Sequence, residues 1–231
     1  MLQSTKSIIN MKRYLKAVAL AVMVALAAPT MAQLTHTAHG TVDENAKNIL
    51  KKAANKFNGS AVSFDVTMIT RNEQKVEMGK VTAQILYKSP KYRVTEKDKQ
   101  TLYCDGTAIW HWNKGTNEVT VNKPSDSDDD LMNPAKLLAN YEKHYRAKYI
   151  RQEDNGTAVI DLTPLKAKSY HKLRLLINAK TGTLIKMEVY QFSGARIEYT
   201  VSAFKSGVAC TDADFRFDAS KAPGVEVIDM R

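Results

Sequence analysis

Catalysis or metal binding would depend on the histidines, cysteines and clustered carboxylates of this chain, and their spacing supports neither. The five histidines are scattered along the sequence, at His36, His39, His111, His144 and His171. No Gly-x-Ser-x-Gly turn, His-Glu-x-x-His pair or Cys-x-x-Cys pair occurs, so nucleophilic, zinc and redox chemistry have no recognisable motif. The aspartates of 123–130 lack the glycine and the closing glutamate of a calcium-binding loop. We therefore predict a protein that is not an enzyme and that uses no cofactor or metal.

A secretory signal peptide is predicted at residues 1–32. Basic residues precede an apolar run at 17–28, and the segment ends in the small-residue pattern that signal peptidase cleaves. The apolar run is too short for a transmembrane helix, which needs about 20 residues. Cleavage after Ala32 would leave residues 33–231, which we predict to form a single exported domain.

Two cysteines, Cys104 and Cys210, remain in the exported chain. In an oxidising compartment an even number of cysteines favours pairing. Closing a loop of about a hundred residues would stabilise the fold by roughly 4 kcal/mol in the chain-entropy model. We predict a disulfide between them, with two buried thiols as the alternative.

The exported chain would be moderately basic. The whole sequence carries a net charge of +10, and removal of the signal region, with four basic and no acidic residues, lowers it to +6. This excess suits an anionic lipid or an acidic partner, and a solvated basic surface is the plainer explanation. No Arg/Lys-aromatic binding motif is present, so we expect no nucleic-acid partner.

The stretch 81–121 predicts a meander of antiparallel strands with one apolar face. Val81, Ala83 and Ile85 occupy alternate positions, which places their side chains on one side of a strand. Pairs such as Asp105-Gly106 supply the positive φ angles that tight turns between strands require. Further strands are expected at 62–68 and between 149 and 201.

Two amphipathic helices interrupt the strands. One is predicted from a capping box, Thr41-x-x-Glu44, to Asn58-Gly59, and the other starts at Asn133-Pro134 and extends to about Arg146. The predicted fold class is α+β, mainly antiparallel β, because a large sheet twists and curls around such helices. If the helices fill the curl, the interior is an ordinary core; if they do not, it encloses an apolar cavity.

Three segments resemble LolA-type periplasmic lipoprotein carriers. They are Asp105–Trp112 with Glu118–Val121, Asn133-Pro134-x-x-Leu137-Leu138, and Phe215-x-Phe217 with Pro223–Asp229. They follow one another in the family's order, and the resemblance covers nearly the whole exported chain, from about Val42 to Arg231.

The resemblance implies a half-open barrel lidded by amphipathic helices. It also implies a soluble periplasmic chaperone that shelters the acyl chains of lipoproteins in a hydrophobic cavity, since each exposed methylene costs about 0.8 kcal/mol in water. The chaperone would carry its cargo from the inner to the outer membrane. Its partners would be acylated lipoproteins, an inner-membrane lipoprotein-releasing transporter and an outer-membrane acceptor, and we expect a monomer. Ser89 precedes Pro90 where receptor-dependent members often carry arginine, which leaves the acceptor open.

The candidate cavity residues are apolar or aromatic side chains of the strands and of the second helix. They are Phe64, Val66, Val81, Ala83, Ile85, Tyr87, Tyr92, Trp110, Trp112, Leu137, Leu138 and Tyr141. Plain core packing is the alternative for each aromatic residue. Two other functions stay open: a regulatory sensor resembling RseB, which would bind a signalling partner and read lipid or misfolded protein, and a hydrolase acting on lipid or glycan.

Overall fold

The computed structural model describes residues 43–124, 137–138 and 141–231. Four predictions fall outside these residues: the signal peptide at 1–32, the capping residue Thr41, the Asn133-Pro134 start of the second helix and most of the aspartate-rich loop. The described residues belong to one compact unit. None of the helices among them is long and apolar enough to cross a membrane.

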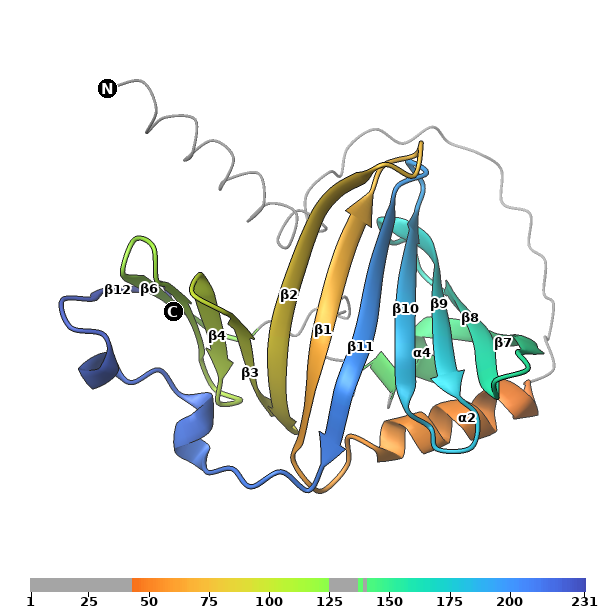
Figure 1. Ribbon diagram of the computed structural model, residues 1–231, viewed down its shortest axis with the longest axis horizontal. Helices are drawn as coiled ribbons and strands as arrows, with labels where there is room; N and C mark the ends of the chain where they lie inside the picture. The colour runs from red at the N-terminus through yellow and green to blue at the C-terminus, as the bar shows by residue number, and fades with distance from the viewer. Residues whose placement is uncertain (1–42, 125–136, 139–140) are drawn as a thin grey trace. The chain divides into compact units, whose positions relative to one another are not determined.

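A twelve-stranded sheet makes up most of the described chain (Figure 1). Its strands are β1 (Val62–Arg71), β2 (Glu77–Lys88), β3 (Lys91–Glu96), β4 (Gln100–Cys104), β5 (Ile109–Asn113), β6 (Glu118–Asn122), β7 (Tyr145–Gln152), β8 (Thr157–Pro164), β9 (Tyr170–Asn178), β10 (Leu184–Gln191), β11 (Arg196–Ser206) and β12 (Glu226–Asp229). Across the sheet the order is β12-β6-β5-β4-β3-β2-β1-β11-β10-β9-β8-β7. Neighbouring strands are antiparallel except for β12, which pairs parallel to β6. The sheet is open, with β12 and β7 as its edges, and the predicted mainly antiparallel class is confirmed.

The strands form where apolar and polar residues alternate and end where turn chemistry interrupts the alternation. In β2, Val81 is half-buried whereas the next residue, Thr82, is exposed. The turn after β4 is fixed by Asp105, whose Oδ1 accepts hydrogen bonds from the N–H groups of Thr107 at 2.8 Å and Ala108 at 2.9 Å. The Asp105-Gly106 turn therefore lies where the sequence placed it.

Helix α2 (Glu44–Asn55) begins after Asp43. One carboxylate oxygen of Asp43 accepts from the N–H of Ala46 at 3.1 Å, and the other accepts from the N–H of Tyr149 in β7 at 2.7 Å. The N-cap is thus Asp43 and not the predicted Thr41, because Asp43 satisfies a helix N–H and a strand N–H with one side chain. The helix also ends earlier than predicted, at Asn55.

The second predicted helix is described at 137–138 and as α4 (Tyr141–His144). Tyr145 already begins β7, so the prediction that the helix extends to Arg146 is wrong. The ladder with β8 explains the change, because Tyr145 pairs with Pro164 and Ala147 pairs with Leu162. Sheet pairing overrides the helical spacing of these residues.

The main core lies between these helices and one face of the sheet, which we call the helix face; the other is the back face. Helix α2 contributes Ala46, Leu50 and Ala53. The sheet contributes fully buried side chains that include Val62, Ile160, Leu162, Leu173, Leu175 and Ile177. Burial of each aliphatic side chain of this size contributes about 1.5–3 kcal/mol, so this cluster anchors α2 to the sheet.

A second, smaller cluster lies near the β12 edge. Ala108, Val119 and Val121 are buried there, and Trp110, Trp112, Phe217 and Val225 pack against them. Phe217 follows a short 3-10 helix, η1 (Asp212–Phe215), which is fastened to β3 by a 2.7 Å ion pair between Lys91 and Asp212. A second 3-10 turn, η2 (Ala219–Lys221), leads towards β12.

The predicted disulfide is not formed in the structure. Cys104 is buried at the end of β4, where its strand partners are Tyr92 and Ile109. Cys210 is half-buried and follows β11 without belonging to a strand. Because no ladder places the two cysteines opposite each other, strand pairing does not bring their sulfurs together.

Candidate functional site

Strand register assigns the candidate residues to faces, because residues directly opposite each other in neighbouring strands point to the same side of a sheet. One continuous row crosses the sheet from β2 to β7. It consists of Val81, Met68, Tyr199, Met187, Leu175, Ile160 and Tyr149. Ile160 and Leu175 belong to the main core, so the whole row lies on the helix face.

Burial falls along this row towards β1 and β2. Leu175 and Ile160 are 0% exposed and Met187 is 5% exposed, whereas Met68 and Val81 are only half-buried. Met68 and Val81 also lie outside the main core cluster and do not pack against it. The helix face is therefore covered over β8, β9 and β10 and partly uncovered over β1 and β2.

We call the partly uncovered region the apolar strip. It consists of Val66, Met68, Val81, Ala83 and Tyr199, all of which are half-buried. Val66 pairs with Ala83 across β1 and β2, and Met68 pairs with Val81 on one side and with Tyr199 on the other. The strip is thus a contiguous apolar surface on three neighbouring strands.

Ionisation does not make this surface polar. Tyr199 has the only titratable side chain among the five residues of the strip, and burial raises its pKa to about 12. Its hydroxyl therefore stays neutral at ordinary pH. The strip offers dispersion and hydrophobic contact without charge.

An aromatic cluster closes one end of the strip. The ring of Phe57 lies edge-on to Phe64, Tyr87 and Phe204, with centroid distances of 6.1, 5.9 and 6.0 Å. Phe204 stacks on Phe64 at 5.9 Å. A bulge in β11 makes this possible, since Ala203 has a φ of 50° and the register with β1 shifts there.

The back face behind the strip carries charge. Arg71 of β1 pairs with Glu198 of β11 at 3.2 Å, and Lys186 of β10 lies 2.8 Å from Glu188 and 3.0 Å from Glu198. Burial acts to raise the pKa of Glu188, but its hydrogen bonds from Lys186 and Tyr190 lower it overall. The same strands are therefore apolar on the helix face and ionic on the back face.

Ten of the twelve predicted cavity residues contribute to the strip or to the core beside it. Phe64, Ile85, Tyr87, Leu138 and Tyr141 are buried in the main core, and Tyr92 and Leu137 pack against it half-buried. Val66, Val81 and Ala83 belong to the strip itself. The strand register thus places the predicted residues of β1 and β2 together on the helix face, and their role as an acyl-chain site stays a prediction.

Trp110 and Trp112 are not brought together with the others. Trp110 pairs with Tyr103 and Val121, and Trp112 pairs with Val119, whereas the residue between them, His111, continues the row of Ile85. Both tryptophans therefore lie on the back face, and the ring of Trp112 is 5.6 Å from that of Phe217. Alternating apolar residues show which side chains of one strand share a face, but they do not relate the faces of successive strands. The turns before Trp110 change the face, and the sequence pattern does not show this.

Sequence reasoning missed Met68 and Tyr199 in the strip and Phe57 and Phe204 in the aromatic cluster. Met68 continues the alternation of Phe64 and Val66, so its place on the same face could be predicted from the sequence. The place of Phe204 could not be predicted in this way, because the bulge at Ala203 breaks the period of two.

The described residues offer no alternative metal centre. No group of three or more histidine, cysteine or acidic side chains that could hold a metal ion occurs within 43–124, 137–138 and 141–231. A polar pocket of about 250 Å³ does occur between the tips of two hairpins, lined by side chains of the back face such as Arg71 and Glu198.

Comparison with known proteins finds a matching family and related chains. The model of the family described as "Outer membrane lipoprotein carrier protein LolA" matches residues 55–218. An outer-membrane lipoprotein carrier protein of Serratia proteamaculans (strain 568) is 25% identical over 203 residues, which cover 86% of this chain and 95% of that protein. The corresponding protein of Photorhabdus laumondii is 25% identical over 191 residues, or 81% of this chain and 89% of that protein.

The fold has a counterpart among solved structures. An uncharacterized conserved protein from Thermus thermophilus superposes with a TM-score of 0.53, covering 80% of this chain and 98% of that chain. The two sequences are 12% identical, so this similarity concerns the fold alone.

Proposed function

The chain belongs to the LolA family of outer membrane lipoprotein carrier proteins, and from this premise we propose that it shelters the acyl chains of lipoproteins on the apolar strip. Its role is binding and release, without a catalytic step. We further propose that residues 1–32 direct export, that 33–231 act as one periplasmic domain, and that the cargo moves from the inner to the outer membrane.

The observation that supports this function is the half-buried strip beside a well-packed core. Leu175 of β9 lies in the same row across the sheet as Met68 and Val81. Leu175 is fully buried, whereas Met68 and Val81 keep part of their surface in water. An acyl chain lying across the strip would remove its own methylenes from water at about 0.8 kcal/mol each. It would also cover apolar side chains that the protein otherwise leaves wet.

Partial coverage also suits release. A carrier has to return its cargo, so the binding surface must shelter the chain without enclosing it as tightly as the core encloses Leu175. Helix α2 is held at its start, where Asp43 accepts a hydrogen bond from the N–H of Tyr149, and near its end Lys52 makes an exposed 3.4 Å contact with the carbonyl of Ala179. We propose that α2 is a fixed wall beside the strip and that exchange takes place over β1 and β2.

We propose that the strip receives its cargo from an inner-membrane lipoprotein-releasing transporter. The acceptor at the outer membrane is a separate question, because Ser89 rather than arginine precedes Pro90. We propose that the acyl site needs no cofactor for its exchange of cargo with the transporter and the acceptor.

The test compares neighbouring residues that point to opposite faces. Val81→Glu places a carboxylate in the strip, outside the main core, whereas Thr82→Glu places the same group on the exposed back face. Each variant is purified with an acylated lipoprotein, and bound cargo is quantified by mass spectrometry after organic extraction. We expect Val81→Glu to lose most of the cargo and Thr82→Glu to retain it, with the same circular dichroism and urea midpoint.

A second arm addresses the sensor alternative. The same lipoprotein with its acylated cysteine replaced should bind neither the parent protein nor the Thr82→Glu variant. Equal binding of acylated and unacylated cargo would instead indicate recognition of polypeptide. Unchanged cargo on a folded Val81→Glu variant would contradict the proposed site.

A further inference from the structure

Two hairpin tips lie side by side at one end of the sheet, at the top of Figure 1. Arg71, at the end of β1, is paired with Arg196, at the start of β11. The position that a Cβ of Gly194 would occupy is 3.0 Å from the Cβ of Glu73 in the neighbouring tip. The β1–β2 tip and the β10–β11 tip therefore form one continuous surface.

This surface exposes large apolar side chains. Phe192 is 72% exposed, Met78 is 57% exposed and Val76 is 55% exposed. The ring of Phe192 lies 5.5 Å from that of His171. Single exposed apolar residues are ordinary on a protein surface, but a group of three on adjoining tips indicates an interaction site.

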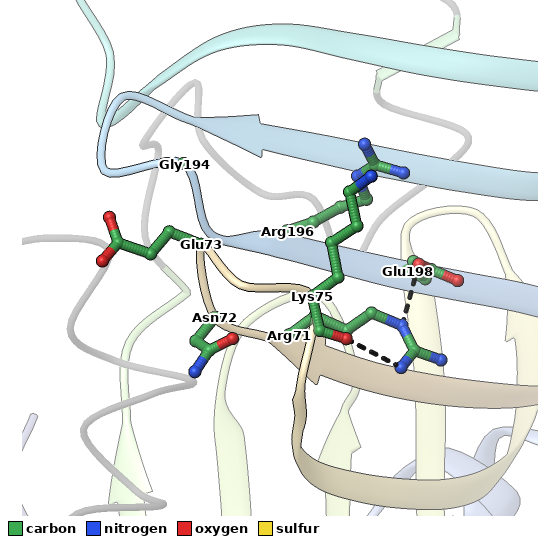
Figure 2. A pocket seen from close by; sticks show the side chains of 7 residues that line it. All are labelled: Arg71, Asn72, Glu73, Lys75, Gly194, Arg196 and Glu198. Atoms are coloured by element: carbon green, nitrogen blue, oxygen red, sulfur yellow. Dashed lines mark hydrogen bonds and ion pairs between the residues drawn. The ribbon is translucent and has the colours of Figure 1, made fainter.

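Cations lie beside the exposed apolar residues. The polar pocket between the tips is lined by Arg71, Asn72, Glu73, Lys75, Gly194, Arg196 and Glu198. Figure 2 shows Lys75 and Arg196 extending to the same side, with Glu73 directed away from them. Arg71 is neutralised by Glu198 at 3.2 Å.

The charges of Lys75 and Arg196 are available for a ligand. Within the described part of the chain, no carboxylate lies within ion-pair distance of either side chain. Arg196 instead lies over the ring of Tyr190 at 4.4 Å, which orients the guanidinium without neutralising it. Lys75 is placed by a tight turn in which its N–H donates to the carbonyl of Asn72 at 3.0 Å and its φ is 64°.

Cations interleaved with exposed aromatic and aliphatic side chains match the interface of an anionic bilayer. Phosphate groups would be contacted by Lys75 and Arg196, while Phe192 and Met78 would enter the layer between headgroups and acyl chains. An acidic protein would satisfy the cations but would need a shaped apolar pocket for Phe192. A lipid surface adapts to side chains that project from loop tips.

The apolar strip reaches the same end of the sheet. Met68 and Tyr199 are each three residues from the paired Arg71 and Arg196, so they lie near the same tips but on the opposite face of the sheet, whereas the aromatic cluster around Phe57 lies towards the other end of β1. We propose that the two hairpin tips are a docking surface for anionic phospholipid membranes, placed at the end of the sheet that the strip reaches on the other face, so that an acyl chain passes around the tips between the bilayer and the strip. The docking part stands independently, while the passage of the acyl chain rests on the proposed function.

The test uses vesicle flotation with the purified exported chain. Vesicles contain phosphatidylcholine alone or phosphatidylcholine mixed with phosphatidylglycerol. The docking variant is Lys75→Gln combined with Arg196→Gln, and the control is Lys51→Gln combined with Lys180→Gln, which removes the same charge from exposed positions on α2 and on the β9–β10 turn. Phe192→Ser probes the apolar contribution.

We expect binding to the anionic vesicles only, because the cations contact lipid phosphate. The docking variant should lose about 25-fold in partitioning, at about fivefold per cation, and Phe192→Ser should lose about tenfold. The control should change by less than about twofold. Equal losses in the docking variant and the control would overturn the proposal, as would equal binding to both kinds of vesicle.

Two further readouts separate this proposal from the proposed function. An acylated peptide in solution should bind the docking variant as it binds the parent protein, and Val81→Glu should float with vesicles while losing the peptide. If inorganic phosphate alone, without vesicles, protects Lys75 from amine modification as strongly as the anionic vesicles do, the surface is a phosphate site and membrane docking is refuted.

Discussion

The seat of α2 on the sheet can be tested by two glycine substitutions that differ in one contact. Gly182 and Gly156 both have left-handed backbones, with φ values of 74° and 81°. A Cβ on Gly182 would lie 2.7 Å from the backbone carbon of Lys52 and 2.8 Å from its oxygen, whereas a Cβ on Gly156 would meet nothing within 4 Å. Replacing each glycine by alanine therefore separates the clash with α2 from the backbone strain.

The magnitude follows from these distances. The left-handed conformation costs an alanine about 1–2 kcal/mol at either position. At Gly182 the end of α2 must also move by about 0.7 Å to restore an ordinary 3.4 Å contact. A gap of 0.5–1 Å forfeits roughly a quarter to a half of the dispersion attraction of the separated atoms, here those of Leu50 and Ala53. We expect Gly182→Ala to destabilise by about 2–4 kcal/mol and Gly156→Ala by about 1–2 kcal/mol.

Urea unfolding followed by circular dichroism measures both free energies. Both variants include the cost of placing alanine in a left-handed backbone conformation. The difference between their unfolding free energies therefore measures the contact between α2 and the β9–β10 turn. If they agree within about 0.5 kcal/mol, α2 is not seated on that turn, and the description of α2 as a fixed wall of the strip is refuted. A loss of acyl binding confined to Gly182→Ala would further connect the wall to the site.

Two further predictions concern the aromatic cluster and the back face. Phe57→Leu should destabilise by about 2–3 kcal/mol, since three edge-on ring contacts each contribute about 0.5–1.5 kcal/mol and do not add fully; Phe192→Leu, at an exposed position, should change the unfolding free energy by less than about 0.5 kcal/mol. Burial acts to raise the pKa of Asp161, but the hydrogen bonds and charges of Arg174 and Lys172 lower it overall. The ionised carboxylate of Asp161 therefore stabilises the folded state, and this contribution is complete above the unfolded pKa of about 3.9. The contribution is lost as the pH falls through the lower pKa that Asp161 has in the folded state. Asp161→Asn should therefore be less stable than the parent protein at neutral pH, and the gap should narrow below about pH 4; a gap that is constant with pH would show that Asp161 is not held as a carboxylate.

The sequence predicts the strands better than it predicts how they face. Alternation in β1 and β2 and turn pairs such as Asp105-Gly106 depend on neighbouring residues, so they can be read locally. The face of Trp110 and Trp112 depends on the pairing of β3, β4 and β5, because a change of one residue in a turn exchanges the two sides of the next strand. The candidate residues of β1 and β2 consequently share one face, as predicted, whereas grouping the two tryptophans with them is wrong.

The predicted helix boundaries are wrong for a related reason. Tyr145 fits the apolar spacing of the second helix, yet it pairs with β8 and begins β7. Asp43 was overlooked as a cap because its second hydrogen bond goes to Tyr149, which is distant in sequence. In both cases a partner far along the chain decided between local conformations of similar energy, and spacing alone carries no information about that partner.

Within the described part of the chain, the apolar strip is left partly uncovered and the sheet does not close over it. Two features oppose collapse. On the back face, Lys186 lies between Glu188 and Glu198, and Glu198 also binds Arg71; this fixes the spacing of β10, β11 and β1, because closing the helix face would stretch these half-buried ion pairs. On the helix face, Phe57 follows the end of α2 and packs against its three ring partners on β1, β2 and β11. The aromatic cluster thus keeps α2 apart from the strip, and the ion pairs of the back face resist bending of β10, β11 and β1. The strip therefore stays partly exposed, as the proposed acyl-binding role requires.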